Sequence, residues 1–170
     1  MMLPRLRRRR SGMTMVEVLV VLGILAVLTS ALFSLLISSL WSWDRGSGKG
    51  QSDTTASIAL QKVVRAIADG MSASVTSGQL TVQLPLLNNQ SDYDRTSNGN
   101  TVKIYLTGTT LYQQVNSGTA TSLSTDITAA AFTVSNGSVT ITLTAQGRTG
   151  KNIMTTQLSQ VVALRNYDAP

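Results

Sequence analysis

The chain has 170 residues, a length that is typical of one domain. It contains no cysteine and no histidine, which excludes disulfides and thiolate sites and removes the commonest general base and metal ligand. The formal net charge is +6, but five arginines lie before Gly12, and the rest of the chain has 9 basic and 8 acidic residues. A basic tail can bind nucleic acid or hold one end of a membrane helix in the cytoplasm. The arginine-rich tail lacks the interleaved aromatic and glycine residues that are typical of nucleic-acid binding. We therefore expect a membrane role and no nucleic-acid partner.

Residues 16–40 are apolar apart from Glu17 and some small hydroxyl side chains, and Trp41 and Trp43 follow directly. A bilayer core requires about 20 apolar residues in a helix, so this segment predicts a transmembrane helix, which we place at 13–43. Tryptophans are typical of membrane–water interfaces. The arginines at the N-terminal side predict a single-pass inner-membrane protein with a cytoplasmic N-terminus and a periplasmic or extracytoplasmic C-terminal domain.

An ordinary cleaved signal peptide is the alternative for this segment. Such peptides have an apolar region of about 7–15 residues followed by small residues, and Thr29-Ser30-Ala31 could supply a cleavage site. Cleavage there would leave a strongly apolar new N-terminus at Leu32. The length of the apolar run therefore favours an anchor over a removed signal.

Three glycines at positions 46, 48 and 50 predict a flexible joint over residues 44–53, because glycine destabilises a helix interior. Asp53 can cap a second helix, predicted over residues 54–69 and ended by Gly70. Apolar side chains at helical spacing predict that one face of this helix packs on a sheet: Leu60, Val63, Val64, Ile67 and Met71.

Beyond the second helix, apolar residues alternate with polar ones and predict β-strands in a sheet over about 79–166. Asn136-Gly137 predicts a hairpin with a type I′ turn, Gly108 a tight connection, and residues 88–100 a polar loop. Since strands follow strands without intervening helices, we expect a mainly antiparallel sheet. The predicted fold class is α+β, with a long N-terminal helix, a second helical segment and this sheet. The second helical segment and the sheet form a globular domain over residues 54–170. The expected strands include residues 80–84, 102–106, 111–115 and 158–164, and the predicted hairpin covers residues 132–143.

The string from Arg10 to Val20, RSGMTMVEVLV, resembles the N-terminus of type IV prepilins and type II secretion pseudopilins. It has a basic leader over residues 1–12, Gly12 at its end, a hydrophobic residue next, and Glu17 at the fifth position after the glycine. Most members of that family have Phe where this chain has Met13. The resemblance implies a pilin-like fold, cleavage after Gly12 by prepilin peptidase, and N-methylation of Met13.

Glu17 is the one charged residue in the apolar segment. A charge inside a membrane helix costs about 2.5–3.5 kcal/mol on insertion scales and usually has a function. The resemblance implies that Glu17 pairs with the N-terminal amine of a neighbouring subunit during filament assembly, so the partners are other pilins or pseudopilins, the peptidase and membrane lipid. Without this motif, Glu17 would be interpreted as an acid that reaches the headgroup region.

The branch of the family is less well defined by the sequence. Arg65 and the terminal run Val161–Asn166 resemble the J-type minor pseudopilin of type II secretion. The chain lacks the C-terminal disulfide loop of many major pilins, which favours a minor subunit. Minor pilins of type IV pili and competence pseudopili share this organisation and remain open.

Asp92 and Asp94, with Thr96 and Asn98, alternate like the start of an oxygen-ligand loop. However, Ser97 stands where an EF-hand requires glycine, and Lys103 where it requires the bidentate glutamate. We therefore expect a polar turn and no metal or other cofactor.

Three functions remain as hypotheses. The first is a structural filament subunit without catalysis. The second is a signal-anchored extracytoplasmic binding domain that does not assemble. The third, a membrane-tethered hydrolase, is disfavoured because the chain lacks His, Cys and a G-x-S-x-G motif.

Overall fold

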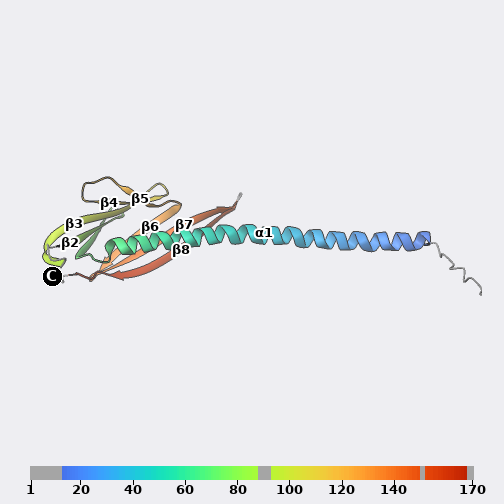
Figure 1. The fold of residues 1–170 in the computed structure, drawn as a ribbon, viewed down its shortest axis with the longest axis horizontal. Helices are drawn as coiled ribbons and strands as arrows, with labels where there is room; N and C mark the ends of the chain where they lie inside the picture. Colours follow the sequence, from blue (N-terminus) through green and yellow to red (C-terminus); the bar gives the residue numbers. More distant parts are fainter. Residues whose placement is uncertain (1–12, 88–92, 150–151, 168–170) are drawn as a thin grey trace, which may run out of the picture. The chain divides into compact units, whose positions relative to one another are not determined.

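The computed structural model describes residues 13–87, 93–149 and 152–167. The chain divides into two units, Met1–Trp43 and Asp44–Pro170, which are described separately below. The fold is α+β with a pilin-like layout, since a long N-terminal helix is followed by antiparallel sheets (Figure 1).

Helix α1 covers Met15–Ile67 and contributes to both units. In the first unit its apolar side chains are exposed, including Trp41 and Trp43 at 62% and 80%. Among the described residues, α1 is the helix that is long and apolar enough to cross a membrane. The predicted apolar helix is therefore present, beginning at Met15.

Residues 44–53 continue α1, so the expected joint and the expected helix start at Asp53 are wrong. Three interior glycines cost a helix about 3 kcal/mol relative to alanine. Tertiary contacts offset this cost, because Gly48 and Ser52 are buried against the β-domain. The second-unit part of α1 ends at Ile67, near the predicted stop at Gly70, whose N–H donates to the Ile67 carbonyl at 2.9 Å.

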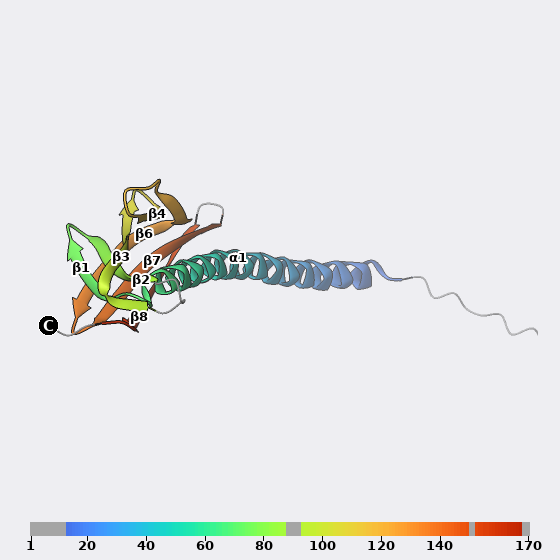
Figure 2. The same cartoon turned by 60° about the vertical axis from the view of Figure 1, so that its left-hand side comes forward.

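Within the described residues, eight strands follow in two antiparallel sheets, where we had expected one (Figure 2). The first sheet has the order β1-β2-β3-β4-β5 and the second has the order β6-β7-β8. The strands of the first sheet are β1 (Ser72–Thr76), β2 (Gln79–Leu87), β3 (Tyr93–Thr107), β4 (Thr110–Val115) and β5 (Thr121–Ser124). Those of the second sheet are β6 (Ile127–Ser135), β7 (Ser138–Thr149) and β8 (Asn152–Ala163).

Both predicted tight turns are confirmed. Asn136 and Gly137 have φ values of 43° and 74° between β6 and β7, and Gly108 has φ of 60° between β3 and β4. Type I′ turns require positive φ at both central residues, which explains the Asn-Gly pair. The polar loop expected over 88–100 is partly wrong, because β3 begins at Tyr93. Residues 88–92 lie outside the described part of the chain.

The hydrophobic core lies between the second-unit part of α1 and the two sheets. The helix contributes Ala56, Ala59, Leu60, Val63 and Ile67, all buried. Leu60, Val63 and Ile67 belong to the predicted stripe, while Val64 is partly buried and Met71 follows the helix. The sheets contribute mainly β-branched and leucine side chains, among them Leu80, Val82, Val102, Ile104, Leu111, Val139, Ile141 and Leu143.

The glycine-rich part of α1 packs closely on the hairpin formed by β7 and β8. A Cβ built on Gly147 would overlap the Gly48 carbonyl oxygen, so only glycine allows the helix and β7 to approach this closely. Buried Ser52 shares a hydrogen bond of 2.9 Å with Thr156. Asn152 donates to Asp44 at 3.0 Å, and the Arg148 N–H donates to the Gln51 side chain at 3.3 Å. Polar contacts therefore attach this end of the helix to the hairpin.

The C-terminal residues close the domain at the other end of the helix. Arg165 N–H donates to the Ala68 carbonyl at 2.9 Å, and the Arg165 guanidinium pairs with Asp69 at 3.3 Å. The side chain of buried Asn166 donates to the Asp69 carbonyl at 2.9 Å. Ala68 and Asp69 directly follow the helix end at Ile67, so this Arg-Asn pair binds the turn through which the chain leaves the helix.

Candidate functional site

The candidate site is the start of α1, next to the predicted cleavage position. Met13 and Thr14 precede the helix, and Met13 is 65% exposed. Gly12 lies outside the described residues. The residue that would become the new N-terminus is therefore accessible and not helical.

Thr14 and Glu17 form a reciprocal capping box. The Glu17 N–H donates to the Thr14 hydroxyl at 3.3 Å, and the Thr14 N–H donates to a Glu17 carboxylate oxygen at 3.4 Å. Each side chain thus satisfies a backbone donor that has no partner at a helix start. This role of Thr14 was not predicted, although Thr-x-x-Glu before an apolar run is typical of a capping box.

The capping box leaves the Glu17 carboxylate with unused hydrogen-bonding capacity. An ionised carboxylate has about four acceptor positions, and the structure shows one long bond to it from the Thr14 N–H. Glu17 is exposed in the first turn of the helix, where the helix dipole also favours a negative charge. Glu17 can therefore cap its own helix and, at the same time, accept hydrogen bonds from a cationic partner.

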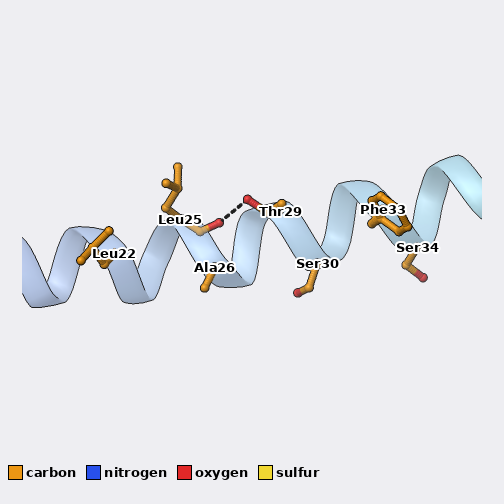
Figure 3. Close-up of a pocket in the computed structure, with 7 residues that line it drawn as sticks. All are labelled: Leu22, Leu25, Ala26, Thr29, Ser30, Phe33 and Ser34. Carbon is orange, nitrogen blue, oxygen red and sulfur yellow. Dashed lines mark hydrogen bonds between the residues drawn. The ribbon is translucent and has the colours of Figure 1, made fainter.

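Some hydroxyl groups of the apolar helix donate hydrogen bonds to carbonyl groups of the same helix. The Thr29 hydroxyl donates to the Leu25 carbonyl at 2.7 Å (Figure 3), and the Ser30 hydroxyl donates to the Val27 carbonyl at 2.8 Å. A hydrocarbon environment offers no water to bond such groups, so internal bonds make these residues tolerable there. These two hydroxyls therefore do not argue against a membrane-spanning helix.

A shallow groove on this helix is lined by residues of α1 alone (Figure 3). Its residues recur at intervals of three and four, so they form one face of the helix, and Ala26, Ser30 and Ser34 are the small ones. The groove lacks charged side chains. We therefore assign no small-molecule ligand to it.

The described part of the chain contains no cluster of three or more Asp, Glu, His or Cys residues that could hold a metal. Asp92 lies outside the described residues. The backbone of Asp94 belongs to β3 and pairs with Leu86, but its side chain is not described.

Comparison with known families identifies the N-terminus. Residues 7–40 match the model of the prokaryotic N-terminal methylation motif. The chain has a prepilin-type N-terminus. This motif is the hallmark of the type IV prepilin and pseudopilin family, so the resemblance seen in the N-terminal sequence is confirmed over these residues, while the J-type assignment is not. No curated protein and no solved structure matches the chain significantly.

The motif has consequences for processing and for partners. It implies processing by prepilin peptidase and association with other pilins in general terms. The apolar helix that follows the prepilin-type leader is compatible with a membrane anchor.

Proposed function

We propose that this chain is a structural subunit of a type IV pilus-like or type II secretion filament, either a minor pilin or a pseudopilin. Prepilin peptidase cuts it after Gly12 and methylates the new N-terminus at Met13. The chain has no catalytic activity of its own. Its apolar helix lies in the inner membrane before assembly and in the filament core afterwards, while the β-domain is extracytoplasmic.

The observation that supports this proposal best is an exposed carboxylate near the start of an apolar helix. Sixteen Leu, Ile, Val and Phe residues between Val16 and Leu40 favour insertion by roughly 5–10 kcal/mol, which outweighs the cost of Glu17. Residues 16–40 contain no Lys or Arg that could pair with it. Cleavage after Gly12 would create a cation, the α-ammonium group of Met13, on every subunit. Glu17 of one subunit can then pair with Met13 of a neighbour as their helices pack.

The C-terminal residues bear on the subtype of the proposed subunit. Arg165 and Asn166, which resemble the J-type pseudopilin C-terminus, bind Asp69 in the turn after α1. This structural use explains why such a pair is suited to that position, and it fits a minor pseudopilin. The same contacts would serve a minor pilin of another system.

Processing is the direct test of the proposal. Intact-mass analysis of the membrane protein should show a chain that begins at Met13 and carries one added methyl group. Replacing Gly12 with leucine should leave full-length precursor in the membrane, because a bulky side chain obstructs the peptidase at the scissile bond. Replacing Ser11 with alanine is the matched control and should be processed normally. A mature chain that begins at Leu32, or a Gly12→Leu variant that is cut as fast as wild type, would contradict the proposal.

Topology provides a second, independent test. The arginine-rich leader should keep the N-terminus in the cytoplasm. A phosphatase reporter that is active only outside the cytoplasm, fused after Pro170, should therefore be active. Neutralising all five leader arginines with glutamine should lower this activity, since the charge asymmetry that sets orientation is removed. Activity of a cytoplasm-only reporter at the same position would mean that the orientation is reversed.

A further inference from the structure

The first sheet has an outer face that does not contribute to the core. Successive side chains of a strand point to opposite faces of the sheet. In β3 and β4, Val102, Ile104 and Leu111 are buried in the core, so the residues that alternate with them point outward. These outward residues are half-buried and do not belong to the core cluster: Lys103, Tyr105, Tyr112 and Gln114.

Two tyrosines lie side by side on this outer face. Tyr105 of the central strand β3 and Tyr112 of β4 are directly opposite each other in the strand pairing. Their ring centroids are 5.9 Å apart and their planes are 23° from parallel, so the rings are stacked. A tyrosine combines a large, rigid apolar ring with one hydroxyl group. The pair therefore offers apolar contact area to a ligand without exposing aliphatic side chains.

Uncharged hydrogen-bonding groups lie next to the tyrosines, together with one cation. Lys103 lies between Thr81 of β2 and Gln114 of β4. It is the one charged residue over residues 101–124, and the sequences of β1 and β2 contain none. Lys103 forms no salt bridge with a carboxylate of the described residues. The face thus presents a stacked aromatic pair, amide and hydroxyl groups, and a single ammonium group.

We propose that the outer face of β3 and β4 binds an acidic polysaccharide, which is a chain of sugar rings that carries carboxylate groups. The C–H groups on one side of a sugar ring form an apolar surface, which packs on the rings of Tyr105 and Tyr112. The sugar hydroxyls donate hydrogen bonds to Thr81 and Gln114 and accept hydrogen bonds from them. A sugar carboxylate pairs with the Lys103 ammonium group, and a hydrogen bond between charged groups is stronger than a neutral one.

The charge of the face favours this ligand over other chains that stack on aromatic side chains. Single-stranded nucleic acid also stacks on tyrosines, but a positively charged groove that follows the phosphate backbone holds it in place. Lys103 alone does not supply such a groove. A neutral polysaccharide would leave the Lys103 ammonium group without an anionic partner. The inference concerns the β-domain alone and goes beyond the proposed filament, since it holds whether or not the chain assembles.

Isothermal titration calorimetry of the detergent-solubilised full chain tests this proposal. The acidic probe is an oligomer of mannuronate, and the neutral probe is a cello-oligosaccharide, which has sugar rings but no carboxylate. The mannuronate oligomer should bind saturably, and salt should weaken its binding because salt screens charges at a protein surface. The neutral probe should bind about 10-fold more weakly, since it lacks the charged hydrogen bond to Lys103.

Three variants separate the contributions of the ring and the charge. Tyr112→Leu keeps an apolar side chain but removes the ring, so binding of both probes should weaken about 5–10-fold while the circular dichroism matches that of wild type. Lys103→Gln should abolish the preference for mannuronate over the neutral probe. Lys49→Gln is the matched control, because Lys49 is exposed on α1 and the variant loses the same charge. It should bind both probes as wild type does. The proposal is overturned if the mannuronate oligomer does not bind, if Lys103→Gln keeps the same preference as Lys49→Gln, or if an oligothymidylate binds more tightly than mannuronate.

Discussion

Replacing Gly147 with alanine is expected to destabilise the β-domain by about 3 kcal/mol, at the upper end of the cost of overpacking. A Cβ at this position would overlap the Gly48 carbonyl oxygen and lie 2.8 Å from the Ser52 backbone nitrogen. Both obstacles are helix backbone, which cannot rotate away as a side chain can. The helix must therefore move off β7, and the hydrogen bond between Ser52 and Thr156 is weakened with it. Urea unfolding of the detergent-solubilised chain, followed by the circular dichroism of the β-domain, measures this loss.

Gly50→Ala is the control, because Gly50 lies in the same helix with nothing within 4 Å of the added Cβ. Alanine is a better helix former than glycine by about 1 kcal/mol, so this variant should be more stable than wild type. The two substitutions add the same methyl group with opposite expected effects. If both variants had the same stability, the close packing of helix and hairpin would not exist in solution.

The glycines of residues 44–53 show where reasoning from the sequence fails. Helix propensity depends only on local sequence. Glycine has a low helix propensity, so the local sequence predicts a break in the helix here. Gly48 and Gly147 are far apart in the sequence, so no local pattern indicates that they meet. The same glycine that weakens the isolated helix allows the close contact that keeps it helical in the domain.

For the strands too, local patterns could be predicted and contacts between distant parts of the chain could not. Strands with a clear period of two, such as β2, β7 and the 102–106 part of β3, could be predicted, and so could the Asn136-Gly137 turn. β1 and β5 were missed because they are short and mostly exposed, with two apolar residues in β1 (Ala73 and Val75) and one in β5 (Leu123), which are too few to define a period. The division into two sheets could not be predicted either, because it depends on which strand edges meet in three dimensions.

The candidate site was more predictable than the fold, because its residues are close in sequence. Glu17, Met13 and the apolar helix follow directly from a contiguous motif. The missed feature was that Glu17 also caps its own helix through Thr14. This second role matters for any experiment on Glu17, since a substitution can remove the cap, the charge or both.

Glu17→Gln is expected to abolish assembly while leaving the helix and its processing intact. Glutamine at this position can still form a capping box, so the helix start is preserved. Only the charge is lost, and membrane insertion becomes easier because a charged group is costly in the bilayer. Cleavage after Gly12 should persist, since it depends mainly on the glycine and the leader. Loss of one partner of a buried ion pair costs about 3 kcal/mol, so association with neighbouring subunits should fall about 100-fold.

The Thr14→Ala variant makes the opposite change and completes the test. It removes the hydroxyl that accepts the Glu17 N–H bond, which costs the helix start about 1 kcal/mol, but it keeps the carboxylate. Crosslinking to partner pilins, measured beside a secretion or piliation assay, should therefore be nearly normal in Thr14→Ala and absent in Glu17→Gln. If Thr14→Ala fails and Glu17→Gln assembles, Glu17 serves the helix cap alone. If both assemble normally, the carboxylate is merely tolerated, and the chain is better described as an anchored extracytoplasmic domain.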